Sequence, residues 1–331
     1  MSAIPEINIA LSQHLNKIAK EYRAVGDNPH RIKAFTKAAL NISQTLSPVI
    51  SGAYARANIE GVGESIEKVI DDFLASGSSQ RLKQMHEDDK EDELKVLELF
   101  QSYYGIGPST AKKFYDEGYR TIQDLMDHAN LSEAQTIGII WHDHIQQRIP
   151  RGEIDLIRER IGYLLDPYGI KWIIAGSYRR QEPLSGDVDI LVEEREDLNM
   201  QGLVLLLSSI LPAKLALGDT KFMGIVRLSK NYYGHRIDIR MVSAQAFPFA
   251  LMYFTGSQQF NILMRQRALD LGYTLNEYAL ISKSTNEEGE VEEVHYMVDD
   301  ESDIFDLLGL LYVPPQERFR TLRHLEVIDQ L

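Results

Sequence analysis

The most informative segment of this chain is Gly186-Asp187-Val188-Asp189-Ile190-Leu191-Val192. Its apolar residues have the composition of a buried strand. Side chains alternate between the two faces of a strand, so Asp187 and Asp189 lie on the same face. A lone Asp-x-Asp is more often part of an ordinary turn, but two carboxylates on one face can share a cation. The stretch therefore predicts a strand that carries part of a metal site.

A third carboxylate lies in a second alternating segment, Arg236-Ile237-Asp238-Ile239-Arg240. The isoleucines are expected to face the core, which turns Asp238 to the opposite face. Three oxygen ligands on adjacent strands suit Mg²⁺, which binds a few carboxylates together with substrate phosphates and water. Two such ions could activate an attacking hydroxyl group and stabilise a leaving pyrophosphate.

A phosphate-binding corner is predicted shortly before the paired carboxylates. Gly176-Ser177 directly follows the strand expected at 172–175 and opens the segment Tyr178-Arg179-Arg180. This places a hydroxyl group, backbone N–H groups and two cations where a strand turns into a helix. Phosphoryl transfer needs mainly positioning and charge neutralisation, which such a corner and a metal site supply together.

The first 150 residues are predicted to be helical. Apolar residues recur at helical spacing over 7–22 and 32–46. Gly61-Val62-Gly63 and Gly105-Ile106-Gly107 each precede a further amphipathic segment, which makes an internal near-repeat of glycine hairpin and helix. We interpret the charged run 86–93 between them as a solvated linker.

A region of mixed strands and helices is predicted after Arg148-Ile149-Pro150-Arg151. Apolar patterning predicts strands at 172–175, 188–192, 224–228, 236–241, 278–282 and 294–298, and helices at 153–165, 201–211, 258–271 and 303–312. The predicted fold class is α+β multidomain, with an N-terminal helical bundle, a mixed β-sheet domain and a small α/β subdomain. The predicted divisions are 1–90, 91–150, 151–253 and 254–331.

The composition limits the possible functions. The chain has no cysteine, which excludes disulfides, thiol catalysis and cysteine-ligated metals. No stretch has the length and apolarity of a membrane span, and no secretory leader is recognisable, so we expect an intracellular protein with no membrane partner. The net charge of −14 argues against nucleic acid as a partner, because phosphate contacts usually come from an excess of basic residues.

The motifs resemble those of a known family. Gly176-Ser177, Gly186-Asp187-Val188-Asp189 and the distant Asp238 are similar to the signature of the nucleotidyltransferase superfamily. Nearly the whole chain resembles the family X DNA polymerases, with DNA polymerase beta as the most similar type. The segments that carry this resemblance, besides the first hairpin, are Gly105-Ile106-Gly107-Pro108-Ser109, Arg148-Ile149-Pro150, Lys221-Phe222-Met223-Gly224, Arg236-Ile237-Asp238-Ile239-Arg240, Tyr253-Phe254-Thr255-Gly256-Ser257, Asn276-Glu277-Tyr278 and Asp303-Ile304-Phe305-Asp306.

The resemblance implies a role for each matched residue. The implied metal ligands and catalytic residues are Asp187, Asp189 and Asp238, the last also near the primer hydroxyl. The residues implied to bind the incoming nucleotide are Arg148, Ser177, Arg180, Gly186, Tyr253, Phe254, Gly256 and Asn261. The residues implied to contact DNA are Gly61, Gly63, Gly105, Gly107, Ser109, Arg236 and Arg265, with His30 and Arg31 near a 5′-phosphate.

The resemblance also implies a palm domain of the nucleotidyltransferase type and a template-directed DNA polymerase that fills short gaps during base-excision repair. Its implied partners are gapped or nicked duplex DNA and deoxynucleoside triphosphates, and its implied cofactors are two Mg²⁺ ions, for which Mn²⁺ can substitute. Helix-hairpin-helix motifs would hold DNA phosphates through backbone N–H groups, with Na⁺ or K⁺ as a bridging ion, which needs no basic excess. We expect a monomer, in the nucleus of a eukaryote or at a viral replication site or in a virion.

The N-terminal region departs from the family pattern. Members with lyase activity use a Schiff-base lysine, but this chain has Val69 at the matching position, and Lys68 beside it is rotated by about 100° on a helix. Residues 1–90 hold eleven basic and eleven acidic side chains. We therefore expect weak 5′-phosphate binding and 5′-deoxyribose-phosphate lyase activity that is weak or absent.

Two departures concern the polymerase part. The loop at 229–235 is short, whereas template-independent relatives have a longer loop there, so we expect this chain to need a template. Gln258 stands where polymerase beta has an aspartate, which predicts different nucleotide affinity and fidelity.

Three rival interpretations stay open. A nucleotidyltransferase that acts on RNA or on unpaired ends would share the carboxylates and the Gly-Ser corner. A non-catalytic DNA-binding protein is expected to have lost a carboxylate, and all three are present. A polymerase that binds DNA weakly because of its negative charge would show steep sensitivity to salt.

Overall fold

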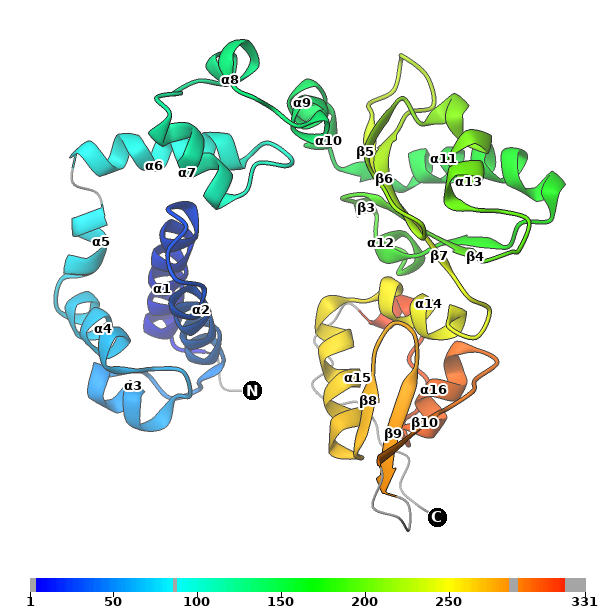
Figure 1. Ribbon diagram of the computed structural model, residues 1–331. Helices are drawn as coiled ribbons and strands as arrows, with labels where there is room; N and C mark the ends of the chain where they lie inside the picture. The colour runs from blue at the N-terminus through cyan, green and yellow to red at the C-terminus, as the bar shows by residue number, and fades with distance from the viewer. Residues whose placement is uncertain (1–3, 86–87, 286–290, 319–331) are drawn as a thin grey trace. The chain divides into compact units, whose positions relative to one another are not determined.

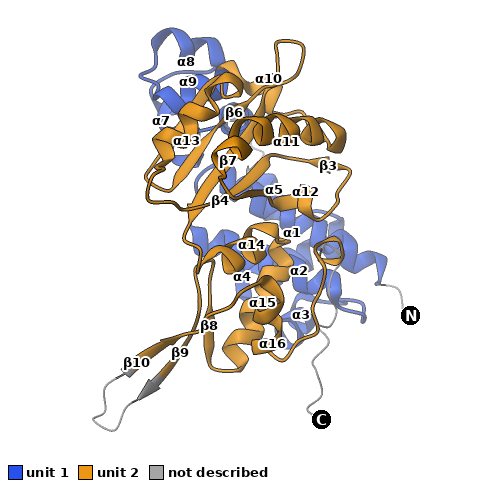
Figure 2. Ribbon diagram, turned by 90° about the vertical axis from the view of Figure 1, so that its right-hand side faces the viewer, with its two compact units in different colours: residues 1–139 blue, residues 140–331 orange. Residues whose placement is uncertain are grey.

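A computed structural model describes residues 4–85, 88–285 and 291–318 of the chain. It divides into two compact units, Met1–Ile139 and Ile140–Leu331, coloured separately in Figure 2. Each unit has hydrophobic cores of its own. Among the described residues, no helix has the length and apolarity needed to cross a membrane.

The regular elements of unit 1 are helices throughout its described residues (Figure 1). They are α1 (Glu6–Ala24), α2 (Pro29–Gln44), α3 (Gly52–Asn58), α4 (Glu64–Ser76), α5 (Gln80–Met85), α6 (Asp88–Gln101), α7 (Pro108–Asp116), α8 (Ile122–His128) and α9 (Glu133–Ile140), which reaches the unit boundary. The predicted apolar faces pack together, since Leu11 and Leu15 of α1 and Phe35 and Ile42 of α2 are buried in one core. A second core joins α6, α7 and α8.

The two glycine hairpins have the same local structure. Gly61 and Gly105 have φ values of +91° and +83°, a left-handed conformation that favours glycine. The next residue of each hairpin, Val62 or Ile106, is buried. Gly63 and Gly107 then begin α4 and α7 without a side-chain cap. The near-repeat predicted from the sequence is therefore present in the structure.

The predicted linker at 86–93 is wrong where the structure describes it. Residues from Asp88 onward form the first turns of α6, and residues 86–87 lie outside the described part of the chain. Charges at helical spacing stabilise this segment, because Lys95 forms ion pairs with Glu91 and Asp92 at 3.0 and 3.5 Å. Glu93 adds an ion pair to Lys112 of α7 at 3.1 Å.

Unit 2 is built on a five-stranded mixed sheet with the order β2-β4-β7-β6-β5. Its strands are β2 (Trp172–Ile174), β4 (Val188–Glu193), β5 (Ala213–Leu217), β6 (Lys221–Val226) and β7 (His235–Val242). β4 and β7 are parallel, and the other neighbours are antiparallel. One face of the sheet packs on α11 (Arg151–Leu165) and α13 (Met200–Leu206), and Leu191 on the other face packs on α14 (Phe247–Thr255).

The rest of unit 2 contains a smaller sheet that shares a hydrophobic core with helices. A three-stranded antiparallel sheet has the order β10-β9-β8. Its core is shared by α14, α15 and α16. The remaining elements of unit 2 are α10 (His142–Ile145), β1 (Ile149–Pro150), η1 (Asp166–Tyr168), α12 (Gly176–Arg179), β3 (Leu184–Ser185), η2 (Ser208–Ile210), α15 (Gln258–Asp270), β8 (Tyr273–Leu275), β9 (Leu280–Thr285), β10 (Val291–His295), α16 (Glu301–Leu307) and η3 (Pro315–Glu317).

Two predicted helices are shorter in the structure than in the sequence pattern. The helix expected at 201–211 ends at Leu206 and is followed by the 3-10 turn η2, after which Pro212 leads into β5. The helix expected at 303–312 is α16, which starts at Glu301 and ends at Leu307. Gly309 has a φ of +63° and its N–H donates to Asp306 O, which terminates the helix.

Candidate active site

Three carboxylates meet at one point of the central sheet. Asp189 of β4 and Asp238 of β7 are register partners across the parallel strand pair. Asp187 immediately precedes β4, and one ligand oxygen from each of the three residues lies within 4.8 Å of the others. The predicted alternation is confirmed, because Ile237 and Ile239 are buried in the core while Asp238 faces the other side.

The charges at this point suit a divalent cation. Burial and the neighbouring charges of Asp187 and Asp238 raise the pKa of Asp189 to about 7. Burial also raises the pKa of Asp238, although Arg236 acts in the opposite direction. Arg236 Nη2 lies 3.2 Å from Asp187 Oδ2 and 3.3 Å from Asp238 Oδ2. This one guanidinium group offsets only part of the negative charge that three ionised carboxylates would carry. In the described structure Asp238 Oδ1 is buried without a hydrogen-bond partner, as expected for a ligand atom.

The Gly-Ser corner directly abuts the carboxylates. Gly176 opens α12 with a φ of +56°, and a Cβ atom there would lie 2.3 Å from Asp189 Oδ2. Glycine is therefore required for both the backbone conformation and the close approach. The preceding Ala175 N–H donates to Asp189 O at 2.8 Å. The hydroxyl of Ser177 donates to Ser185 Oγ at 2.8 Å, which fixes its side chain in the turn.

Two arginines predicted to bind the nucleotide lie at this corner. Arg180 Nη1 donates to Thr255 O at 2.6 Å, and burial lowers the pKa of its guanidinium group. Its Nε is buried and makes no hydrogen bond to the described residues. Arg148 lies against Gly186, where a Cβ atom would come within 3.1 Å of Arg148 Nη1. Both arginines can thus present positive charge beside the carboxylates.

A cleft of about 830 Å³ joins these groups to residues of α14 and α15. Most of the predicted nucleotide and metal residues line it together. The lining residues are Arg148, Gly176, Ser177, Arg180, Gly186, Asp187, Asp189, Tyr253, Phe254, Thr255, Gly256, Ser257, Gln258, Asn261, Ile262 and Arg265. Asp238 and Arg236 are joined to this set through Asp187.

Aromatic and amide groups form the α14–α15 side of the cleft. Asn261 Nδ2 donates to Tyr253 O at 2.7 Å, while Asn261 Oδ1 is buried and has no partner among the described residues. The guanidinium of Arg265 lies 4.9 Å from the centre of the Tyr253 ring, and that of Arg240 lies 5.4 Å from the Phe254 ring. Arg180 and Asn261 thus each have a buried polar atom with no partner among the described residues, and both residues line a space with the size of a ligand site.

The remaining predicted residues belong to unit 1. Gly63 and Gly107, the N-cap residues of α4 and α7, are exposed, and no atom of the described residues would lie within 4 Å of a Cβ added at either one. Ser109 is exposed in the first turn of α7. His30 is exposed. Arg31 Nη1 forms an ion pair with Asp27 Oδ2 at 2.7 Å.

The position matched to the family's Schiff-base lysine is part of a core. Val69 is 4% exposed and packs in the apolar cluster of α1, α2 and α4. Lys68 is solvent-exposed and lies 3.5 Å from Glu64 on the same helix. A desolvated amine of the kind that forms Schiff bases is therefore absent from both positions.

Sequence reasoning missed several polar residues that support the cleft. Ser185, Arg179, Glu301 and Arg318 were not among the predicted site residues, although each bonds to a residue of the cleft or to its neighbour. A local signal existed for Arg179, which stands next to Arg180 in the sequence, and for Ser185, which stands next to Gly186. Glu301 is 122 residues away from its partner Arg179, so no local pattern links them.

Three protein-family models match consecutive parts of the chain. The first describes the fingers domain of DNA polymerase lambda and matches residues 98–146. The second describes the DNA polymerase beta palm and matches residues 148–244, which include the three carboxylates. The third describes the DNA polymerase beta thumb and matches residues 250–319.

Curated relatives match nearly the whole chain. DNA polymerase lambda of Rattus norvegicus is 31% identical over 328 residues, which cover 94% of this chain and 56% of the relative. DNA polymerase lambda of Arabidopsis thaliana is 25% identical over 336 residues, covering 95% of this chain and 62% of the relative. The DNA polymerase/3'-5' exonuclease PolX of Bacillus subtilis (strain 168) is 28% identical over 320 residues, covering 92% and 53%. The chain thus spans little more than half the length of these relatives.

Proposed function

This chain belongs to the family X DNA polymerases, and on that basis we propose that it is a DNA-directed DNA polymerase that fills short gaps in duplex DNA during base-excision repair. It would transfer a nucleotidyl group from a deoxynucleoside triphosphate to the 3′ hydroxyl of a primer and release pyrophosphate. The observation that carries the proposal is the meeting of Asp187, Asp189 and Asp238 beside the Gly176-Ser177 corner in one cleft.

Polymerases of this family use divalent metal, and the three-carboxylate cluster has the donor set to bind it. We propose that Asp187, Asp189 and Asp238 hold two Mg²⁺ ions, with Mn²⁺ as a substitute. When bound, the ions would lower the pKa of the primer hydroxyl and neutralise charge on the pyrophosphate. By its match to the family motif, Asp238 would also lie near the primer hydroxyl.

The other cleft residues would orient the nucleotide. Ser177, Gly186 and the N–H groups of α12 would bind the triphosphate, with Arg180 and Arg148 supplying positive charge. Tyr253, Phe254, Gly256 and Asn261 would surround the sugar and base, and the backbone next to Tyr253 would exclude a ribose 2′ hydroxyl. Arg236 and Arg265 would contact the primer and template strands.

We propose that DNA is held largely by main-chain groups. The uncapped starts of α4 and α7 after Gly61-Val62-Gly63 and Gly105-Ile106-Gly107-Pro108-Ser109 would bind backbone phosphates, with Na⁺ or K⁺ as a bridging ion. Such contacts need few basic side chains and are compatible with a net charge of −14. His30 and Arg31 would make only weak contacts to a 5′-phosphate, since Arg31 is already paired with Asp27.

We propose that the chain has four domains with different roles. They would be a lyase-like domain at 1–90 with little or no lyase activity, a DNA-binding subdomain at 91–150, a palm at 151–253 and a nucleotide-selection subdomain at 254–331. The protein would act on gapped or nicked duplex DNA as a monomer.

Single-nucleotide extension tests the proposal. Wild-type protein with Mg²⁺ is given a duplex with a one-nucleotide gap and each of the four deoxynucleotides in turn, beside a single-stranded primer and an RNA primer. We expect addition of the complementary nucleotide to the gapped duplex. Untemplated addition, or addition to RNA alone, would instead indicate a nucleotidyltransferase of another class, and no addition at any salt concentration would indicate a non-catalytic DNA-binding protein.

A further inference from the structure

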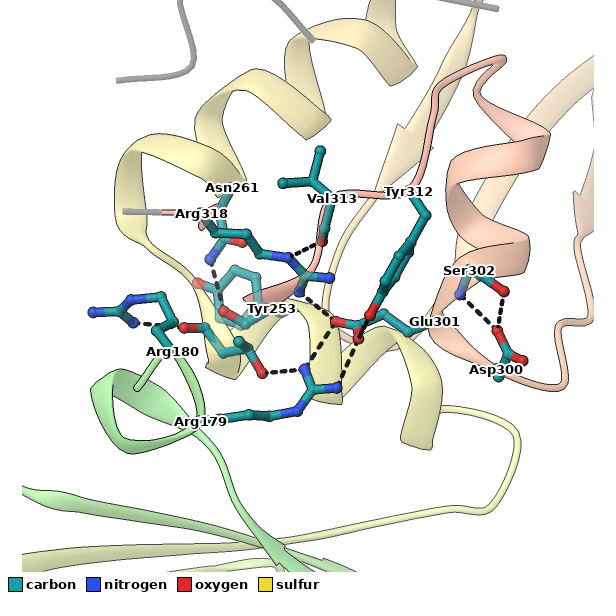
Figure 3. Close-up of polar contacts among 11 residues, drawn as sticks. Arg179, Arg180, Tyr253, Asn261, Asp300, Glu301, Ser302, Tyr312, Val313 and Arg318 are labelled. Carbon is teal, nitrogen blue, oxygen red and sulfur yellow. Dashed lines mark hydrogen bonds and ion pairs between the residues drawn. The ribbon is translucent and has the colours of Figure 1, made fainter. Parts of the chain in front are cut away.

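A buried carboxylate lies between two arginines next to the cleft, as Figure 3 shows. Glu301, the first residue of α16, is 5% exposed. Its Oε2 accepts from Arg179 Nη2 at 2.9 Å and its Oε1 accepts from Arg179 Nη1 at 3.2 Å. Arg318 Nη1 donates to Glu301 Oε1 at 2.5 Å from the opposite side. One acidic residue therefore joins α12 to the segment that follows η3.

The same two arginines hold both ends of a turn that lines the cleft. Arg179 Nη1 donates to Thr255 Oγ1 at 2.8 Å, and Ser257 Oγ donates to Arg318 O at 2.8 Å. Gly256 lies between these two anchored residues. Thr255, Arg179, Glu301, Arg318 and Ser257 thus form a continuous chain of contacts around the turn. Figure 3 labels its three central members, Arg179, Glu301 and Arg318.

The contacts extend to the arginine at the phosphate corner. Arg180 follows Arg179 in the sequence and donates to the main-chain oxygen of Thr255 at 2.6 Å. Thr255 is completely buried and is therefore bound by two adjacent arginines, through its side chain and its backbone. A shift of Arg179 would consequently move both the turn and Arg180.

Stability alone is a poor explanation for this cluster. Arg318 is completely buried, its guanidinium lies 4.8 Å from the Phe260 ring, and its Nε donates to Val313 O at 2.8 Å. Burying two cations and one anion costs desolvation energy, and apolar residues of similar volume often stabilise a fold as well or better. Burial alone would raise the pKa of Glu301, but the hydrogen bonds from Arg179 and Arg318 lower it overall. What such a cluster supplies in return is fixed geometry.

We propose that Glu301 is a positioning residue for nucleotide binding, which holds Arg179 and Arg318 so that the turn at Thr255–Ser257 and the neighbouring Arg180 fit an incoming deoxynucleoside triphosphate. This inference rests on the proposed polymerase function. The inference goes beyond the polymerase function because it assigns an effect on nucleotide affinity to Glu301, which does not line the cleft.

The variant Arg179→Gln tests this role. It cuts the link between α12 and Glu301 but leaves the neutral pair of Glu301 and Arg318 intact, so the core keeps a balanced charge. Arg195→Gln is the matched control, because Arg195 also binds a carboxylate, Asp197 at 2.7 Å, and one backbone carbonyl, but lies away from the cleft.

Steady-state extension of a one-nucleotide gapped duplex separates the possible outcomes. We expect Arg179→Gln to raise the KM for the complementary deoxynucleotide about tenfold, with kcat within about twofold of wild type and unchanged affinity for gapped DNA. A loss of triphosphate contacts made equally in the ground state and the transition state has this signature. The Arg195→Gln control should keep the wild-type KM.

A second variant distinguishes geometry from charge. Arg179→Lys keeps the positive charge next to Glu301 but cannot form the forked contacts to Glu301 and Thr255 together. We expect it to recover thermal stability while its KM stays raised.

The inference is overturned if Arg179→Gln and Arg179→Lys lower only the melting temperature and keep the wild-type KM while wild type is active. Absence of templated addition by wild type and by Arg195→Gln would instead overturn the proposed function, and this inference with it. Wild-type activity together with a raised KM in both Arg179 variants supports both.

Discussion

Asp189 and Asp238 lie side by side as register partners on the parallel strands β4 and β7. Parallel pairing at the centre of a sheet fixes the spacing of its side chains, because both strands are anchored by cores on either face. Asp187 joins them from the residue before β4. The geometry of the candidate metal site is therefore set by the paired strands of the central sheet, while the nucleotide side of the cleft depends on side chains from α12, α14 and α15.

Replacing Gly176 with alanine should strongly reduce gap-filling activity. The new Cβ would lie 2.3 Å from Asp189 Oδ2, and the φ of +56° disfavours any side chain. We expect kcat/KM for gap filling to fall by at least about 100-fold, since the displaced carboxylate would no longer match the reacting groups.

Gly152→Ala is the control for this substitution. Gly152 lies in the first turn of α11, and no atom in the described part of the chain would lie within 4 Å of an added Cβ. This variant should keep wild-type kinetics. Wild-type kinetics in Gly176→Ala as well would show that the close approach to Asp189 is not required.

Gln181→Gly should stabilise the chain. Gln181 is exposed and has a φ of +63°, the only positive φ of a non-glycine residue in the described structure. A side chain in this conformation costs about 1–2 kcal/mol, part of which is offset by the greater freedom of glycine in the unfolded chain. We expect the free energy of unfolding of unit 2 to rise by about 0.5–1 kcal/mol in urea denaturation. An unchanged or lower value would mean that Gln181 is not strained.

Stability should depend on the ionisation of Glu301. Burial raises the pKa of this carboxyl group, but the hydrogen bonds from Arg179 and Arg318 outweigh burial and leave its pKa below the ordinary value of 4.5. A carboxylate with a depressed pKa contributes its full stability above the ordinary value and loses it as the pH falls through the folded-state value.

Glu301→Gln measures this contribution against wild type. Removing one member of a buried ion cluster costs about 3–5 kcal/mol, so the variant should be less stable by about this amount at neutral pH. The difference in unfolding free energy should shrink as the pH is lowered below 4.5. A difference that stays constant over this range would contradict the ion pairing seen in the structure.

No covalent intermediate should form with a 5′-deoxyribose-phosphate end. Val69 is buried in the core of unit 1, and Lys68 is exposed beside Glu64, so neither position offers a desolvated amine. Borohydride treatment of the protein with an incised abasic duplex should trap no adduct above background. An adduct that disappears in Lys68→Ala would show that Lys68 is a Schiff-base nucleophile after all.

Local sequence patterns predicted the elements that carry the carboxylates. Alternating apolar residues placed strands at 188–192 and 236–241, and the structure has β4 and β7 within a residue of these bounds. The same alternation gave the correct face for Asp238. These predictions succeed because the burial of one sheet face fixes which side chains point away from it.

Contacts between distant parts of the chain could not be predicted in this way. Glu301 has no sequence feature that ties it to Arg179 or Arg318, and its burial results from the packing of α16 against α14. Helix ends were also misjudged where apolar periodicity continues past a terminating turn, as at Gly309. The charged start of α6 resembles a linker in composition, but its ion pairs at helical spacing stabilise a helix.

Extension of a one-nucleotide gapped duplex by Asp238→Asn tests whether the three carboxylates form the metal site of a polymerase. The substitution keeps the size of the side chain and removes the charge of one proposed metal ligand, while Asp219→Asn, at the exposed turn between β5 and β6, removes a charge elsewhere in the same sheet. We predict that Asp238→Asn lowers the rate of templated addition by at least about 100-fold while Asp219→Asn keeps the wild-type rate. Templated addition by Asp238→Asn at the wild-type rate would contradict a metal-dependent polymerase built on these three carboxylates.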